Sequence, residues 1–380
     1  MRHPSIITTA ATLAAALLLT ACGASPTATG TTPGAQGGDT SAKTEVSAKA
    51  QAVYDQLNGL TGEERKKKLE ELALAEGKLS IYTSNTDIDD VISGFEDTYD
   101  IEVSVYRGNS ESVLQRVLQE QEANYFGTDF VETNGGELNI MNKEGFFYPY
   151  LGTLRDSVRK EGQGDNWTAT RFNAFVVGWN TDKVTPGQEP AAFADLADPK
   201  WKGQVSMEVG DVDWFAGLYT YLLSQGKTDA EVKDLFTKVA ANSKIAKGHT
   251  TQGELLSAGQ FGITASSYSH TIDKAANDGA PVAWHNGSGT PVQPIVIRPN
   301  GMALMKTATN PAAAMLFADY ELTEGQKALA ESFRMGAIAG PTDPFAGFTV
   351  VTVPEQDLLD NPKKWDDLYE QVVSAGQEVK

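Results

Sequence analysis

Five consecutive polar residues follow a short apolar segment, GITA, that is typical of a buried strand. Ser266, Ser267, Tyr268, Ser269 and His270 bring four hydroxyl groups and one imidazole together. A simple turn would use Gly, Asn or Pro at these positions. The residue types therefore predict hydrogen bonds to a polar ligand. The alternative is that Tyr268 only closes the end of a strand.

Catalytic chemistry has little support in the sequence. The chain contains no G-x-S-x-G, H-E-x-x-H, Walker or G-x-G-x-x-G motif. His270 follows Ser269, but neither a nucleophile elbow nor an orienting acid accompanies the pair, as acyl transfer would require. We therefore predict no enzymatic activity and no cofactor. An extracytoplasmic hydrolase and an adhesive surface protein are the alternatives.

The N-terminus has the features of an export signal. Arg2 precedes an apolar stretch at 10–19 that is too short to span a bilayer as a helix. The stretch leads into Leu-Thr-Ala-Cys, which resembles a bacterial lipobox, and Cys22 is the only cysteine. We expect residues 1–21 to be removed as a lipoprotein signal peptide. Cys22 would then carry lipid, including palmitate, that anchors the protein at the outer face of the cell membrane. The alternative is a plain secretory signal.

Composition limits both the fold and the partners. Residues 22–44 are rich in Gly, Thr, Ala and Pro and predict a disordered tether. The remaining chain is long enough for two domains, and a single cysteine excludes an intrachain disulfide. The formal net charge of −19 argues against nucleic acid and against an anionic membrane surface as electrostatic partners. Contact with the membrane is therefore expected through the lipid alone.

Strands and amphipathic helices alternate along the chain. Residues 79–83, 101–106 and 128–133 have the composition of strands. Helices are expected from Asp87 and over 112–122. Because parallel strands need crossover connections, this alternation predicts parallel sheets with helices on their faces.

Further helix starts are marked by capping pairs and by Pro311, which can occupy a first helical position. The predicted capping boxes are Thr61–Glu64, Thr228–Glu231, Thr251–Glu254 and Thr323–Gln326.

Five segments together resemble the extracellular solute-binding proteins of ABC importers, in particular the ferric-iron-binding type. They are EERKKKLEELALAEGKLSIYTS, LQRVLQEQEANYFGTDFVETN, NKEGFFYPY, FADLADPKWKGQVSM and NPAAAMLFADYELTEGQKALAE, in family order over residues 63–340. The resemblance implies an α/β, two-lobed periplasmic-binding-protein-like (type II) fold with an interlobe ligand cleft. It also implies a monomer that carries a small molecule or a metal to the permease of an ABC transporter.

The same resemblance suggests how the chain is divided. Lobe 1 would comprise 78–172 and 292–345, and lobe 2 would comprise 173–291. Residues 45–77 would form a helical N-terminal extension, and 346–380 a C-terminal helical segment. Crossovers between the lobes are expected near residues 131–134, 172–175 and 292–295.

Four loops would face the cleft in such a fold, together with the segment that ends at His270. They follow or precede predicted elements at residues 84–86, 109–110, 132–136 and 210–214. Helix capping, a glycine-rich turn and an acidic helix start are the alternative explanations for these loops. The predicted ligand-binding residues are Ser84, Asn85, Thr86, Asn109, Ser110, Asn134, Gly135, Asp213, Trp214, Ser267, Tyr268 and His270.

The match to an iron site is incomplete. In the ferric-iron-binding type, two adjacent tyrosines bind the metal, but here Tyr268 has serine on both sides. The family's metal histidine falls on Asn85 or Thr86, and its glutamate falls near Asn134. Ferric iron prefers several anionic oxygen ligands. We therefore expect a polar organic ligand or a chelate, with Tyr268 as the candidate metal ligand.

Charges in the predicted cleft loops favour a cationic or neutral polar solute. Opposite charges attract strongly in a partly dry cleft, and Trp214 or Tyr268 would add cation–π attraction. Ferric iron completed by an exogenous anion is the competing prediction. The acidic residues are Asp87, Glu111, Glu132, Glu208, Asp211 and Asp213, against chiefly Arg107 and Arg171.

Overall fold

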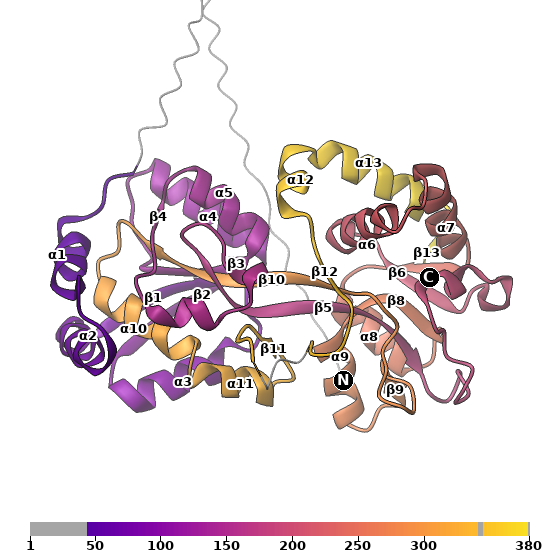
Figure 1. Ribbon diagram of the computed structural model, residues 1–380, viewed down its shortest axis with the longest axis horizontal. Coiled ribbons are helices and arrows are strands. Elements are labelled where there is room, and N and C mark those ends of the chain that lie inside the picture. The colour runs from indigo at the N-terminus through magenta and orange to yellow at the C-terminus, as the bar shows by residue number, and fades with distance from the viewer. Residues whose placement is uncertain (1–43, 341–344, 379–380) are drawn as a thin grey trace, which may run out of the picture. The chain divides into compact units, whose positions relative to one another are not determined.

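A computed structural model describes residues 44–340 and 345–378 (Figure 1). They belong to a compact unit that runs from Ala42 to Lys380. Cys22, the predicted signal peptide and the predicted tether up to residue 43 lie outside the described residues. Within the described ranges, no helix combines the length and the apolar character that crossing a membrane requires.

Lobe 1 is built on three parallel strands joined by helices. Strand β1 pairs in parallel with β2 and with β3, and the long strand β10 runs antiparallel beside β3. Parallel neighbours end at the same edge of a sheet, so the loops after β1, β2 and β3 lie together. The main elements are β1 (Lys78–Thr83), α3 (Ile88–Tyr99), β2 (Glu102–Arg107), α4 (Ser110–Glu122), β3 (Phe130–Asn134), α5 (Gly135–Lys143), β4 (Phe147–Tyr148), β10 (Ile295–Met305), α10 (Pro311–Glu321), α11 (Gly325–Glu331) and β11 (Met335–Gly336).

Lobe 2 repeats this plan. Strand β6 pairs in parallel with β7 and β8, and the long strand β5 runs antiparallel beside β8. The carboxyl ends of β6, β7 and β8 therefore also share one edge. The elements are β5 (Thr168–Asn180), β6 (Val205–Glu208), α6 (Val212–Ser224), α7 (Asp229–Ala241), β7 (Ser243–Ala246), α8 (His249–Ser257), β8 (Ile263–Tyr268), α9 (Ser269–Asn277) and β9 (Val282–Ala283).

Strands β5 and β10 join the two lobes into one sheet. They pair antiparallel, with Phe175 opposite Val296 and Thr168 opposite Met302, and Figure 1 shows both running from one lobe into the other. The order across the sheet is β13-β7-β6-β8-β5-β10-β3-β1-β2. The predicted crossover near residues 172–175 lies within β5.

Helical segments at both ends of the described chain pack onto different lobes. Helix α2 (Gly62–Glu76), which follows α1 (Ala48–Leu57), packs on α10, where Arg65 pairs with Asp319 at 2.6 Å. At the other end, α13 contacts α6 and α7. The C-terminal elements are β12 (Val350–Thr352), α12 (Glu355–Asp360), α13 (Pro362–Val373) and β13 (Gln377–Glu378).

Each lobe has its own aromatic core. In lobe 1, Phe317 meets Phe95 and Phe130 edge to face, with ring centroids 5.0 and 5.1 Å apart. In lobe 2, Phe215 packs on Phe236 with centroids 4.7 Å apart. The side chains of α13 complete this second core. Such aromatic packing fixes the elements that carry the cleft loops.

The helix starts agree only partly with their sequence signals. The capping box at residues 228–231 is present, and Pro311 is the first residue of α10. The box predicted at 251–254 is wrong, because α8 begins earlier, directly after Gly248 with its positive φ of 86°. The box predicted at 323–326 is also wrong, because α11 begins at Gly325. Thr61 precedes α2 but makes no capping hydrogen bond through its side chain.

Candidate functional site: the interlobe cleft

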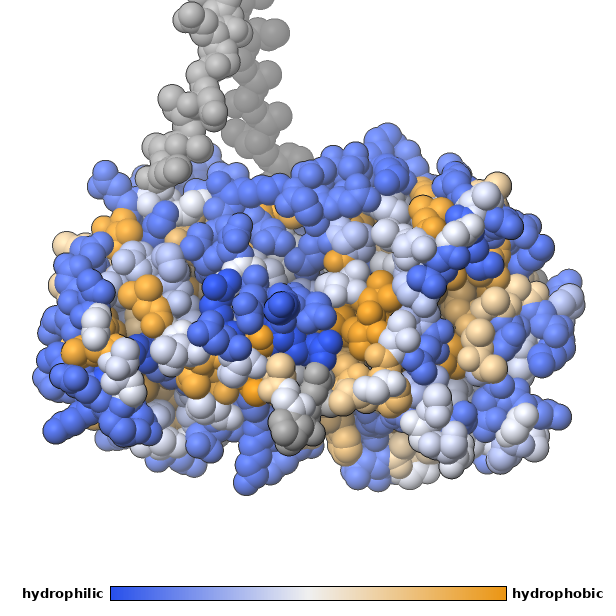
Figure 2. Space-filling view, in the orientation of Figure 1, coloured by the Kyte–Doolittle hydropathy of each residue, from blue (hydrophilic) through white to orange (hydrophobic). Residues whose placement is uncertain are grey.

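A cleft lies where the carboxyl ends of strands from both lobes meet. Its cavity volume is about 290 Å³, which lies at the lower end of the range of small-molecule sites. The face of the molecule in Figure 2 is mostly hydrophilic, with its most hydrophilic area near the middle, beside an apolar area. The lining residues are Ser84, Thr86, Arg107, Asn109, Ser110, Asn134, Arg171, Asn173, His249, Thr250, Tyr268, His270, Thr271, Arg298, Asn300 and Arg334.

The structure brings many of the predicted site residues together in this cleft. They come from the loop after β1, from the end of β3, from the start of α4 and from the junction of β8 with α9. Asn109 also caps α4, because its side chain accepts a hydrogen bond from the backbone N–H of Ser112. Capping and a position in the cleft are therefore compatible. The predicted residues that line the cleft are Ser84, Thr86, Asn109, Ser110, Asn134, Tyr268 and His270.

The other predicted residues do not line this cleft. Trp214 is a correction: its indole is buried in the lobe 2 core and meets Phe193 and Phe236 edge to face. Asn85 and Ser267 are also buried. Gly135 begins α5, and Asp213 lies in the first turn of α6, where it lines a neighbouring cavity.

Sequence reasoning named Arg171 as a basic residue of the cleft but missed the other polar residues that β5 and β10 present to it, which are Asn173, Arg298 and Asn300. Arg171 and Asn173 alternate on β5, and Arg298 and Asn300 alternate on β10. In the antiparallel register, Asn173 faces Arg298 and Arg171 faces Asn300. A period of two within otherwise apolar strands was the available signal. Arg334 follows α11 in the loop, and no local pattern marks it as a cleft residue.

Arg171 is held by a buried carboxylate. Its guanidinium Nη1 donates to Glu132 Oε1, and both side chains are almost completely buried. Glu132 also accepts hydrogen bonds from Thr83 Oγ1 at 2.6 Å and from Thr170 Oγ1 at 3.2 Å. The Nε of Arg171 finds no partner in the described part of the chain. The carboxylate of Glu132 is therefore already occupied by Arg171 and the two threonines. Arg171 Nε is the donor that remains without a partner among the described residues.

Arg334 brings a second guanidinium to the same wall. Its Nε donates to Asp87 Oδ2 at 2.7 Å, and its Nη2 donates to Thr86 Oγ1 at 2.6 Å. Burial and the nearby guanidinium of Arg171 lower the pKa of Arg334. Burial and repulsion from both arginines lower the pKa of His270 well below its ordinary value. Three basic side chains thus lie close together, where burial and mutual repulsion disfavour their charged forms. A bound anion would favour the charged forms again.

Tyr268 lies between aromatic side chains of lobe 2 and the guanidinium of Arg298 on β10. Its ring centroid is 4.0 Å from that of His249 and 5.0 Å from that of Phe175. Its hydroxyl accepts a hydrogen bond from Arg298 Nη2 at 3.0 Å, while Arg298 Nη1 pairs with Asp213 at 2.7 Å. Burial raises the pKa of Tyr268, although Arg298 opposes the shift. The phenol is therefore protonated at neutral pH and is a poor metal ligand until a metal displaces its proton.

Glu208, Asp211 and His249 form a cluster whose ligand atoms lie within 4.8 Å of one another. Glu208 accepts hydrogen bonds from the backbone N–H of Gly248 at 2.8 Å and of Gly210 at 2.5 Å. His249 Nε2 pairs with Asp211 at 2.8 Å. Burial would lower the pKa of His249, but Asp211 raises it above its ordinary value. His249 and Asp211 pair with each other, and Glu208 binds backbone N–H groups, so each of the three side chains has a protein partner.

The prediction of a cleft dominated by carboxylates is wrong for this part of the molecule. No carboxylate is among the described lining residues, whereas four arginines are. The reason is internal pairing: Asp87, Glu132 and Asp213 each bind one of those arginines. The fourth, Arg107, has no ion-pair partner within the described ranges.

Comparison with known proteins agrees with this architecture. A family model for bacterial extracellular solute-binding proteins matches residues 138–343, which is more than half of the chain. The chain belongs to this family. Its solute-binding role is of the ABC importer type, and the family is a transport family rather than an enzyme family. The predicted resemblance and the predicted type II fold are confirmed.

Similar proteins include several with iron in their names. This solute-binding protein is 24% identical over 270 residues to Iron uptake protein A1 of Synechocystis sp., covering 66% of this chain and 72% of that protein. Iron-bound HitA from Pseudomonas aeruginosa matches with a TM-score of 0.64 and 19% identity, over 78% of this chain and 99% of its own. AfuA from Actinobacillus pleuropneumoniae, solved with exogenous fructose-6-phosphate, matches with a TM-score of 0.63 and 19% identity, over 79% and 99%. At these identities, the structures show a shared fold.

Proposed function

We propose that this solute-binding protein captures a small organic anion in the interlobe cleft and delivers it to the permease of an ABC transporter. The observation that carries the proposal is the convergence of Arg171, Arg334 and His270 on one wall of the cleft. Arginine presents a planar set of donors that fits phosphate and carboxylate oxygens. The solved complex of AfuA with fructose-6-phosphate supports a phosphorylated solute as one candidate.

A binding panel tests the proposal. We expect fructose 6-phosphate, citrate or another organic anion to raise the melting temperature and to release or absorb measurable heat in calorimetry. Fructose and spermidine are the neutral and cationic controls. Replacing Arg334 by Gln should weaken anion binding at least tenfold, because it removes charge from the wall. Replacing exposed Lys238, which pairs with Asp234 on its own helix, by Gln is the matched control. Tight binding of spermidine in place of every anion would overturn the proposal.

Ferric iron held together with an anion is the second candidate. It is favoured by Tyr268 in the cleft and by a solved Trichodesmium IdiA (FutA) complex that contains iron and citrate, at a TM-score of 0.61. A phenolate bound to ferric iron gives a visible charge-transfer band. Adding ferric citrate should therefore colour the protein only if Tyr268 coordinates iron, and Tyr268→Phe should remove that colour. A colourless complex of similar affinity in both proteins would assign citrate binding to the basic wall alone.

Anchoring by lipid at Cys22 is a further part of the proposal. It is supported by the lipobox-like sequence and by the family's extracellular location. A Cys22→Ser variant should lose the lipid mass and leave the membrane fraction in an intact cell.

Size-exclusion chromatography with light scattering should give the mass of a monomer. Incubation with the bound anion should leave it chemically unchanged, since we propose transport and not turnover.

A further inference from the structure

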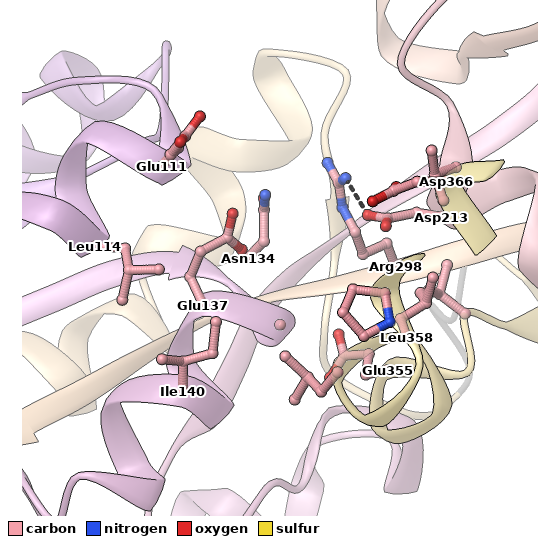
Figure 3. Close-up of a pocket in the computed structure, with 15 residues that line it drawn as sticks. Glu111, Leu114, Asn134, Glu137, Ile140, Asp213, Arg298, Glu355, Leu358 and Asp366 are labelled. Carbon is pink, nitrogen blue, oxygen red and sulfur yellow. Dashed lines mark hydrogen bonds and ion pairs between the residues drawn. The ribbon is translucent and has the colours of Figure 1, made fainter. Parts of the chain in front are cut away.

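A second cavity adjoins the basic cleft and has the opposite character (Figure 3). It has a cavity volume of about 260 Å³ and lies between α4 and α5 of lobe 1 and α6, α12 and α13. Asn134 and Arg298 line both cavities, so the two spaces meet at these side chains. We call this second space the acidic annex. Its lining residues are Glu111, Leu114, Asn134, Gly136, Glu137, Ile140, Val212, Asp213, Arg298, Val353, Glu355, Leu358, Leu359, Pro362 and Asp366.

Apolar side chains form much of the wall of the annex. Leu114 and Ile140 lie on the lobe 1 side and Leu358 on the opposite side in Figure 3. This arrangement differs from the basic cleft, whose lining is almost entirely polar. A short alkyl chain would be removed from water between these side chains, at about 25 cal/mol for each Å² buried.

Carboxylates face one another across the annex. Glu111 and Glu137 project from lobe 1, whereas Asp213 and Asp366 lie on the other side (Figure 3). Asp213 pairs with Arg298 at 2.7 Å. For the remaining carboxylates, no cation within the described ranges lies at ion-pair distance.

Glu355 is the most constrained of these groups. It begins α12, and its carboxylate lies directly over Gly135 at the start of α5. One oxygen accepts a hydrogen bond from Asn139 Nδ2 at 2.9 Å, and the buried Oε1 has no partner among the described residues. Burial, then repulsion from Asp213 and Glu137, raises the pKa of Glu355 to about 8, although Arg298 opposes the shift. A buried acceptor without a donor marks a place where a cationic donor would be stabilised.

We propose that the solute is a zwitterion whose anionic group binds in the basic cleft and whose ammonium group binds in the acidic annex. A short alkyl spacer would pass Arg298 and pack against the apolar wall. This inference rests on the proposed function, because it uses the same anion site. It adds that the cleft selects amino-bearing phosphonates or carboxylates over their counterparts without the amine. Both charged groups of the ligand then find oppositely charged partners, with Asn134 and Arg298 between them.

Matched ligand pairs provide the test. Ethylphosphonate and propylphosphonate are compared by calorimetry with 2-aminoethylphosphonate and 3-aminopropylphosphonate, and butyrate is compared with 4-aminobutyrate. We expect the best amino compound to bind at least tenfold more tightly than its partner. At pH 9, where Glu355 is ionised, Glu355→Gln keeps the hydrogen bond to Asn139 but removes the charge, and should reduce the ratio at least threefold. Asp360→Asn is the control, because Asp360 is an exposed carboxylate at the end of the same helix.

The pH dependence gives a second measurement. The groups that face Glu355 are Asp213 on α6, Glu137 and Asn139 on α5, and Arg298 on β10. As pH rises from 6.5 to 9, Glu355 ionises while an alkylammonium stays charged, so the amino preference should grow. The Glu355→Gln variant should show a flat ratio over the same range. Unchanged melting temperatures in the variants will show that they are folded, and Glu137→Gln provides an independent replacement if Glu355→Gln is unstable.

The outcomes separate this inference from the proposed function. If both members of each pair bind equally, the anion site stands and the zwitterion inference fails. If no member of any pair binds while spermidine does, both fail. A preference for the amino compounds that survives Glu355→Gln and Glu137→Gln also overturns the inference, because the annex would not then be its source.

Discussion

Residues at the floor of the cleft combine a stabilising role with a binding role. Arg171 can keep its charge while almost completely buried because Glu132 lies beside it and is itself held by two threonine hydroxyls. A buried ion pair contributes little net stability, but removing one partner leaves an uncompensated charge. The donors that Arg171 would offer to an anion are therefore positioned by residues that the anion does not touch.

Replacing Glu132 by Ala should destabilise the protein by about 3 kcal/mol or more, because the charge of Arg171 then stays buried without its partner. Glu132→Gln should cost less, since the amide oxygen still accepts hydrogen bonds. Urea denaturation followed by fluorescence measures the difference. Glu331→Ala, on the exposed face of α11, is the control and should change stability by less than about 0.5 kcal/mol. A Glu132→Ala protein as stable as the control would contradict the arrangement.

Anion binding should be coupled to proton uptake by His270. Burial and the two arginines keep the pKa of His270 low, so the imidazole is neutral at pH 7 in the free protein. A bound anion favours the charged imidazole and raises its pKa. Affinity should therefore rise as pH falls from about 7.5 towards 6. Calorimetry in two buffers with different ionisation enthalpies measures the protons taken up, and His270→Asn should abolish the uptake.

At the scale of single elements, α12 connects the two lobes through Glu355 at its start and through Asp360 at its end, which pairs with Lys143 of α5 at 3.6 Å. It begins with Glu355, which covers Gly135 and accepts a hydrogen bond from Asn139 of α5. It then leads into α13, whose Trp365 and Tyr369 are buried in the lobe 2 core. The close approach of Glu355 to α5 therefore requires a residue without a side chain at position 135.

Two neighbouring glycines allow a controlled test of this contact. A Cβ at Gly135 would overlap the carboxylate of Glu355, whereas a Cβ at Gly136 would meet no atom within 4 Å. Gly135→Ala should therefore displace Glu355 and lower stability by about 1 kcal/mol, while Gly136→Ala should be neutral or slightly stabilising. Differential scanning calorimetry compares the two. Equal melting temperatures would show that Glu355 does not hold α12 in place.

At the scale of the whole molecule, the cleft is formed by both lobes, so a bound solute contacts both at once. A ligand shifts a conformational equilibrium by its difference in affinity for the two states. We predict that the tightest-binding anion of the panel lowers the radius of gyration in small-angle scattering. The Arg334→Gln variant at the same anion concentration is the control. A saturated protein with an unchanged scattering curve would count against interlobe closure.

The sequence was sufficient to predict where the main strands and cleft loops lie. It was not sufficient to predict the charge of the cleft. Strand positions followed from apolar runs such as the one before Tyr268, and the cleft loops followed because parallel strands end together. The charge of the cleft did not follow, since Glu132 and Asp87 are neutralised by arginines distant in sequence. Trp214 was misplaced because an aromatic residue in the first turn of a helix can face either the cleft or the core. Long-range pairing of this kind leaves no local signal.

Strands β5 and β10 are at once the connection between the lobes and the source of Arg171 and Arg298. Two of the residues that would bind the ligand, Arg171 and Arg298, therefore lie on the strands that would bend if the lobes close. A substitution there changes two properties together: which solute is held, and how stiffly the strands resist bending. Substitutions at these positions that favour a new solute would then also alter how readily the lobes close. Ligand specificity and interlobe flexibility would therefore evolve together.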